Sequence, residues 1–169
     1  MPHHRQVIFH SEKTITINGD TTTVFDSLYT LTGSVRIVHF HAEVITAVLA
    51  ANLTAAYLDI FPTGGAAVVL TKIAGAPAIS DFEVGSILAK NSDVAQILDV
   101  QRADVAMILE AGVALQKIPF PFIAGKKSGA VTTIRFSYIA GADYSLETGQ
   151  ILWHCEWIPR TEDGLLVAA

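Results

Sequence analysis

The sequence predicts an all-β protein, either a β-sandwich or a jelly-roll-like barrel, with room for one short helix in the middle of the chain. Three observations support this fold class: short runs alternate apolar and polar residues, turn signals rich in Gly, Pro and Asn separate them, and helical periodicity is scarce. At 169 residues the chain is long enough for one domain with its own core. We therefore expect an N-terminal arm over residues 1–11, the β domain over 12–160 and a C-terminal tail over 161–169.

The first predicted element is a hairpin. Lys13–Ile17 and Asp20–Phe25 alternate in polarity, and Asn18-Gly19 between them favours the positive φ angles of a type I′ turn. After Gly33 a long strand is expected from Ser34 to about Thr46. Simple alternation assigns its residues to two faces: Val35, Ile37, His39, His41, Glu43 and Ile45 on one, and Val38, Phe40, Ala42 and Val44 on the other. Because both faces are largely apolar, we expect this strand to be covered on both sides.

The middle of the chain supports two further strands and one open question. Leu53–Phe61 and Ala66–Lys72 are the strands, and Pro62-Thr-Gly-Gly between them is a turn. Over residues 93–110 the sequence fits both a helix and a strand. Apolar residues recur there at helical spacing (Val94, Ile97, Leu98, Val105, Ile108 and Leu109), whereas Val105, Met107 and Leu109 also alternate as in a strand.

The C-terminal third returns to clear alternation. Ile118–Phe122 carries two prolines that remove N–H donors from one edge, which is typical of an edge strand. A turn at Gly125–Gly129 leads into a strand over 132–138, and a second strand places Ile151, Trp153, Cys155 and Trp157 opposite His154 and Glu156. The tail becomes apolar again at Leu165–Ala169, so we expect it to rest on a neighbouring molecule.

Composition indicates an assembly component. Only 16% of the residues are charged, against an average of about a quarter, and 51% are hydrophobic. From Leu31 to Ala78 the charged residues are Arg36, Glu43, Asp59 and Lys72. So much weakly polar surface is typical of a protein buried against other copies of itself or a larger partner. The net charge of −5 and the dispersed basic residues argue against nucleic acid as that partner.

The sequence also gives expectations about compartment. The single cysteine removes any need for an oxidising environment, and the N-terminus lacks the layout of a signal peptide. Val44–Leu58, the longest uncharged apolar stretch, falls short of the about 20 residues of a membrane helix. We therefore expect an intracellular product with no membrane partner.

One constellation could bind a metal. His39, His41 and Glu43 are two residues apart on a predicted strand, so they share a face, and two imidazoles with a carboxylate form the ligand set of many zinc and non-haem iron sites. Together with Gly33 the histidine pair resembles the opening of the first cupin motif. Glu43 comes too soon after His41 for that motif, and no Pro-x-Gly precedes His154 to make the second one. The alternative is a strand face or subunit contact, and we expect no metal and no cofactor.

No other motif predicts catalysis. A nucleophile elbow, a phosphate loop and a dinucleotide fingerprint are all absent from the sequence. Cys155 is expected to be a small buried hydrophobe, because the adjacent His154 points to the opposite face of the strand. Phe120, Phe122, Trp153 and Trp157 could line a sugar-binding groove, with core packing as the alternative. The protein is therefore expected not to be an enzyme, and a carbohydrate-binding module stays open as a second alternative.

Part of the chain resembles small β-rich virion proteins of tailed bacteriophages. The resemblance runs from Leu31 to Ala169 and is weakest across Ile79–Gln116. It rests on a Thr-Gly-x-Val opening strand at Thr32, small-residue strands after it, and a closing tail with an aromatic residue, a proline, a glycine and a valine in order.

That resemblance implies a capsid decoration or other head-associated protein without catalysis. Such a protein is made in the host cytoplasm, becomes part of the virion, and often acts as a homotrimer on the major capsid protein or a similar shell. The segments expected to make contacts are the arm, Met1–Ser11, and the tail, above all Leu165, Leu166 and Val167.

Overall fold

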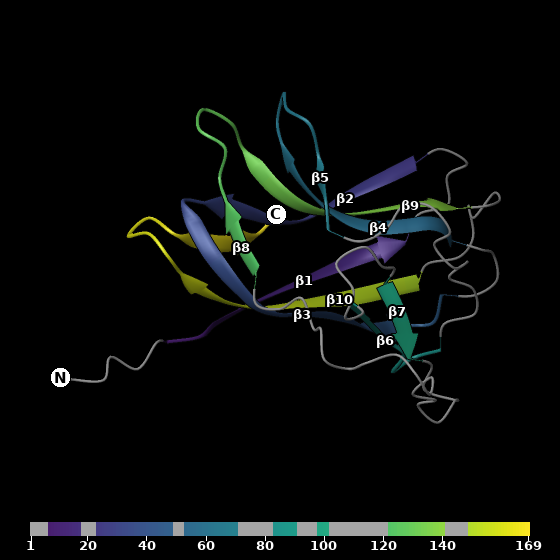
Figure 1. Cartoon of the computed structure of the whole chain (residues 1–169). Helices are drawn as coiled ribbons and strands as arrows, with labels where there is room; N and C mark the ends of the chain where they lie inside the picture. The colour runs from purple at the N-terminus through teal and green to yellow at the C-terminus, as the bar shows by residue number, and fades with distance from the viewer. Residues whose placement is uncertain are drawn as a thin grey trace, which may run out of the picture.

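The protein is a sandwich of two antiparallel β-sheets that face each other across one core (Figure 1). The computed structural model describes residues 7–17, 23–48, 53–70, 83–90, 98–101, 122–140 and 149–169. The strands in these ranges are β1 (Phe9–Ile17), β2 (Thr23–Thr32), β3 (Ser34–Thr46), β4 (Leu53–Pro62), β5 (Val68–Val69), β6 (Ile87–Lys90), β7 (Leu98–Gln101), β8 (Phe122–Gly125), β9 (Thr132–Ala140), β10 (Gly149–Pro159) and β11 (Leu165–Ala168). The all-β prediction is confirmed, and its sandwich form holds because neither sheet closes into a barrel.

Each sheet has a simple strand order. In the first, which we call sheet A, the order is β1-β10-β3-β6-β7, and β8 also pairs with β3. In the second, sheet B, the order is β11-β2-β9-β4-β5. Strands β1 and β11 are therefore edge strands, and they carry the first and last described parts of the chain. No helix in the described ranges has the length and hydropathy needed to cross a membrane.

The core is built around one tryptophan. Trp153 on β10 is fully buried, and its ring lies 5.4 Å from that of Phe40 on β3 and 5.1 Å from that of Phe136 on β9. Tyr29 on β2 meets Phe40 edge to face at 5.9 Å. Aromatic side chains from both sheets thus interlock, and each removes about 150–250 Å² from water, which holds the two layers together.

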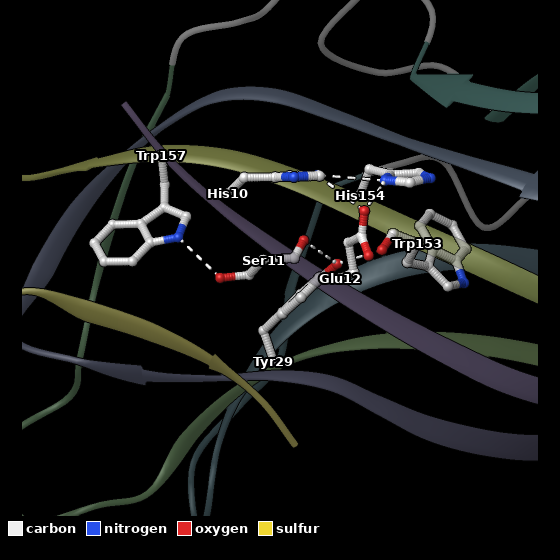
Figure 2. Close-up of polar contacts among 7 residues, drawn as sticks. All are labelled: His10, Ser11, Glu12, Tyr29, Trp153, His154 and Trp157. Atoms are coloured by element: carbon white, nitrogen blue, oxygen red, sulfur yellow. Dashed lines mark hydrogen bonds and ion pairs between the residues drawn. The ribbon is translucent and has the colours of Figure 1, made fainter. Parts of the chain in front are cut away.

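A buried hydrogen-bond network ties the sheets together near β1 (Figure 2). The Tyr29 hydroxyl lies 2.8 Å from the Trp153 carbonyl oxygen and 3.1 Å from that of Ser11, so it links β2 of sheet B to two strands of sheet A. Ser11 Oγ accepts a hydrogen bond from Trp157 Nε1 and donates one to the Leu166 carbonyl, both at 3.0 Å. Burial raises the pKa of Tyr29, so its hydroxyl keeps the proton that it donates.

The predicted hairpin of Lys13–Ile17 with Asp20–Phe25 is wrong. Strand β1 pairs with β10 along its whole length, from Phe9 opposite Trp157 to Ile17 opposite Gly149, whereas β2 pairs with β9 and β11. The chain therefore passes from sheet A to sheet B between these strands, and the Asn-Gly turn itself lies outside the described residues. A turn signal indicates that the chain reverses, but it does not determine which strands pair with each other.

The predicted faces of β3 are also wrong in one respect. Val35 and Ile37 are buried, but the buried positions beyond them are Phe40, Ala42 and Val44. The alternation changes phase because Glu156 and Trp157 of β10 face His39 and Ile37, which leaves Val38 as an extra residue in a β-bulge. His39 is exposed, so this end of the strand is covered on one side rather than on both.

Elsewhere the local predictions vary in outcome. The turn after β4 is confirmed: Gly64 has φ +72°, and the Gly65 amide bonds the Pro62 carbonyl at 2.9 Å. Of the strand predicted after it, Val68–Val69 forms within the described part, and residues 71 and 72 lie outside the described residues. Over 93–110, Leu98–Gln101 is the strand β7 rather than a helix, and the rest of that range lies outside the described residues. The proline edge at 118–121 lies outside them too, although the following residues form β8 along β3.

Both chain ends join the sandwich. Strand β1 begins at Phe9, inside the predicted arm, and β11 lies inside the predicted tail, where it pairs with β2 from Leu165 opposite Thr32 to Ala168 opposite Tyr29. Leu166 is buried in the core, while Leu165 and Val167 are exposed. The tail is therefore a strand of sheet B with a fixed inner and outer side.

Candidate metal centre

Histidines and glutamates gather on the outer face of sheet A. Strands β1, β10 and β3 lie side by side, and their inward positions are filled by core residues such as Ile15, Cys155 and Phe40. The polar residues between these positions point outward and meet across the strands. In one row Glu12 faces His154, which faces His41, and in the next row His10 faces Glu156, which faces His39.

Three ligand atoms converge at the β1 side of this face (Figure 2). His154 Nδ1 lies 3.3 Å from His10 Nε2 and 3.3 Å from Glu12 Oε1, and His10 Nε2 lies 3.7 Å from the same Glu12 oxygen. The side chains of His10 and Glu12 are 49% and 53% exposed, whereas that of His154 is 16% exposed. Among the described residues this is the one group of three potential ligands close enough to hold a metal ion. We call His10, Glu12 and His154 the histidine–glutamate triad.

The His154 ring is nearly parallel to two neighbouring imidazole rings, with His10 at its edge and His41 against its face. Its ring lies 5.4 Å from that of His10 with 11° between the planes, and 4.8 Å from that of His41 with 15° between them. Desolvation lowers the pKa of His41, and the neighbouring His154 and His39 lower it further. The neutral form of His41 is thereby favoured, so it packs against His154 without adding a positive charge beside the triad.

The sequence-predicted candidates occupy the same face but are not the converging set. His39, His41 and Glu43 all lie on the outer face of β3, in agreement with their predicted common face, and His41 stacks on His154. The set that converges instead includes His10 and Glu12 from β1, which sequence reasoning missed. Their His-x-Glu spacing is the signal that could have found them, because it is the spacing that drew attention to His41 and Glu43.

The remaining candidates are core residues where they are described. Cys155 is buried and its pKa is raised by desolvation, so the prediction of a buried small hydrophobe is confirmed. Trp153 and Trp157 are buried as well, which confirms core packing for both and leaves neither indole face open to a sugar. Phe120 lies outside the described residues, and Phe122 begins β8.

A comparison of the chain with protein-family models, curated proteins and solved structures finds no match in any of the three.

Proposed function

We propose that this protein is a non-enzymatic structural protein of a virion, a capsid decoration or stabilising protein that acts as a homo-oligomer, with a trimer favoured. The observation that carries the proposal is an apolar edge made by both ends of the described chain. Its function on this proposal is mechanical: added contacts between shell subunits resist their separation.

The edge consists of β1 and β11, which close the same side of the two sheets. They are joined through the hydrogen bond from Ser11 to the Leu166 carbonyl and through a second one from Lys13 Nζ to the Ala169 carbonyl. The large exposed apolar residues along this side are Val7, Ile8, Phe9, Leu165 and Val167. We call β1, β11 and these five residues together the terminal edge.

Edge strands with exposed apolar side chains favour pairing with another chain. Each has a row of main-chain donors and acceptors on its free side, and soluble monomers usually protect such edges with charges, prolines or bulges. Leu165 and Val167 carry no charge, and a chain with 16% charged residues loses little hydration when it buries this surface. A specific interface needs about 800 Å² per partner, and we propose that a second copy supplies it at the terminal edge.

The virion setting is supported by the resemblance of residues 31–169 to small β-rich phage proteins and by their shared all-β character. On this proposal the oligomer contacts the major capsid protein or a similar shell, with neither nucleic acid nor membrane as a partner.

The solution mass of the purified protein, measured by light scattering over a dilution series, tests the proposal. We expect a trimer that resists dilution. The double variant Leu165→Glu/Val167→Glu should dissociate it, because both side chains are exposed and their replacement leaves the core residue Leu166 in place. The matched control is Val68→Glu/Val131→Glu, which adds the same two charges at exposed apolar positions that are not part of the terminal edge.

Two results would contradict the proposal. A wild-type monomer that also fails to bind isolated shells excludes a decoration protein. An oligomer that keeps its mass and shell binding both in the double variant and after truncation at Asp163 excludes the terminal edge as the contact.

A further inference from the structure

We propose that the histidine–glutamate triad, His10, Glu12 and His154, is a zinc-binding site that fastens the edge strand β1 to the rest of sheet A. This inference is independent of the proposed virion function and rests on the geometry, the chemistry and the setting of the three side chains.

The geometry fits a tetrahedral ion. Zinc bound at about 2.0–2.1 Å by tetrahedral ligands keeps any two ligand atoms about 3.3–3.4 Å apart. Two sides of the triad are 3.3 Å long and the third, between His10 Nε2 and Glu12 Oε1, is 3.7 Å. Magnesium, with octahedral ligands at about 2.0–2.1 Å, would require separations of about 2.8–3.0 Å, which are shorter than all three sides.

The chemistry of the ligands also favours zinc. Two imidazole nitrogens and one carboxylate oxygen form a borderline ligand set that binds zinc well, whereas magnesium and calcium prefer oxygen ligands alone. The side chains of His10 and Glu12 are about half exposed, so a water molecule can fill the fourth coordination position. The site therefore has the three protein ligands and one open position of an accessible zinc centre.

A single cation can accept the electron pairs of all three ligand atoms. Imidazole nitrogens of His10 and His154 face each other beside a carboxylate oxygen, and one shared hydrogen can satisfy only one of these contacts at a time. A divalent ion placed among the three atoms would satisfy them all at once.

The backbone prearranges the ligands. Glu12 and His154 are register partners in the β1–β10 ladder, and His10 is two residues away on the same face of β1. His154 packs against the nearly parallel ring of His41 and its side chain is 16% exposed, so little side-chain freedom is lost when it binds an ion. Two ligands come from the edge strand and one from its neighbour, so bound zinc would cross-link β1 to β10.

Isothermal titration with ZnCl₂ at pH 7.5 tests the site. The full chain is used with His3→Gln and His4→Gln in every sample, because the N-terminal histidine pair has incidental metal affinity of its own. We expect one zinc ion per chain. His10→Gln, Glu12→Gln and His154→Gln should each weaken binding by about tenfold or more, since each removes a direct ligand.

The matched controls are His39→Gln and Glu43→Gln, which make the same changes on the same outer face but outside the triad. Each should change the zinc affinity less than about twofold, within the usual scatter for a residue that is not a ligand. Melting in EDTA checks the folding of every variant, and if His154→Gln unfolds, the exposed His10→Gln carries the test.

Three outcomes would overturn the proposal: no saturable zinc binding by the parent chain, unchanged affinity in His10→Gln and Glu12→Gln, or loss of binding in the His39→Gln or Glu43→Gln control. The last outcome would place the ion at the β3 residues instead.

Discussion

The outer faces of the two sheets both carry charged groups, but they arrange them in opposite ways. On sheet B, Arg135 of β9 makes a two-pronged ion pair with Asp59 of β4, with N···O distances of 2.9 and 2.7 Å. Its guanidinium lies between the rings of Phe25 and Phe61, 4.6 and 3.8 Å from their centroids. On sheet A, His10, Glu12 and His154 converge on one another, and the contacts between them are those of two imidazoles and one carboxylate.

The difference distinguishes a structural polar group from a candidate site. Asp59 is 1% exposed, and its two oxygens are satisfied by one planar cation, so the pair needs nothing from outside the chain. The triad instead brings together three electron-pair donors, two of them half exposed, and an external ion would complete it.

The largest change in stability is expected from breaking the ion pair between Arg135 and Asp59. Asp59→Ala should lower the free energy of unfolding by about 3–5 kcal/mol, because it leaves the Arg135 guanidinium poorly accessible to water and without its partner. Urea unfolding measures the change, and Glu162→Ala, at an exposed position, is the control with an expected change within about 0.5 kcal/mol. A loss below about 1 kcal/mol in Asp59→Ala would mean that the pair is not structural.

Zinc should give the next largest effect. If it binds only the folded chain, a free concentration one hundred times the dissociation constant adds about 2.7 kcal/mol of stability. Thermal melts with zinc and with EDTA measure this gain. We expect it in the parent chain and in His39→Gln, and we expect His10→Gln to lose it. Equal gains in all three proteins would assign the effect to some other site.

Removing the Tyr29 hydroxyl should change the free energy of unfolding less than Asp59→Ala or zinc binding does. Tyr29→Phe keeps the ring packed in the core but leaves the carbonyls of Trp153 and Ser11 without this donor, at a cost of about 1–3 kcal/mol. Urea unfolding is the measurement. Because Ser11 lies between two triad residues, the variant should also weaken zinc binding slightly through β1. An unchanged unfolding curve would show that the network adds nothing to the joining of the sheets.

The smallest change in stability is expected at Asp26, a partly buried carboxylate on β2. Burial raises the pKa of Asp26, against the lowering effects of a hydrogen bond to Tyr138 and the charge of Lys13, and its Oδ2 is buried without a hydrogen-bond partner. At pH values just above the ordinary pKa of an aspartate, the folded state therefore binds more protons at Asp26 than the unfolded state does. The free energy of unfolding consequently falls as the pH rises through this range.

Asp26→Asn removes that charge. It should raise stability at pH 7 by up to about 1 kcal/mol and leave it almost unchanged near pH 3, where the parent carboxyl is protonated as well. Unfolding curves at both pH values measure the difference. A variant that is less stable at pH 7 would show that the carboxylate is worth more to the fold than its burial costs.

Sequence reasoning succeeded where the information is local. The alternation of β9 placed Phe136 and Tyr138 on one face, and that of β10 placed Trp153 and Cys155 on one face. All four are buried, because a half-buried strand repeats every two residues. It failed where a residue's position depends on a distant strand. The partner of β1 is β10, more than a hundred residues away, and the bulge at Val38 arises from the register against Glu156 and Trp157.

The candidate site shows the same limit. The common face of His39, His41 and Glu43 on β3 was predicted correctly, and so was the position of His154 on the face of β10 opposite Trp153 and Cys155. No local pattern could show that His10 and Glu12 stand beside His154, since that follows only from the β1–β10 register. The His-x-Glu spacing marks His10 and Glu12 as a possible pair, but their convergence with His154 is visible only once the β1–β10 pairing is known.

The most direct test of an open, zinc-binding face on sheet A is anomalous diffraction at the zinc edge from crystals grown with ZnCl₂. The predicted result is a peak about 2.0–2.2 Å from His10 Nε2, Glu12 Oε1 and His154 Nδ1. A peak at His39, His41 and Glu43 instead, or no peak on this face in crystals that hold zinc elsewhere, would contradict the account.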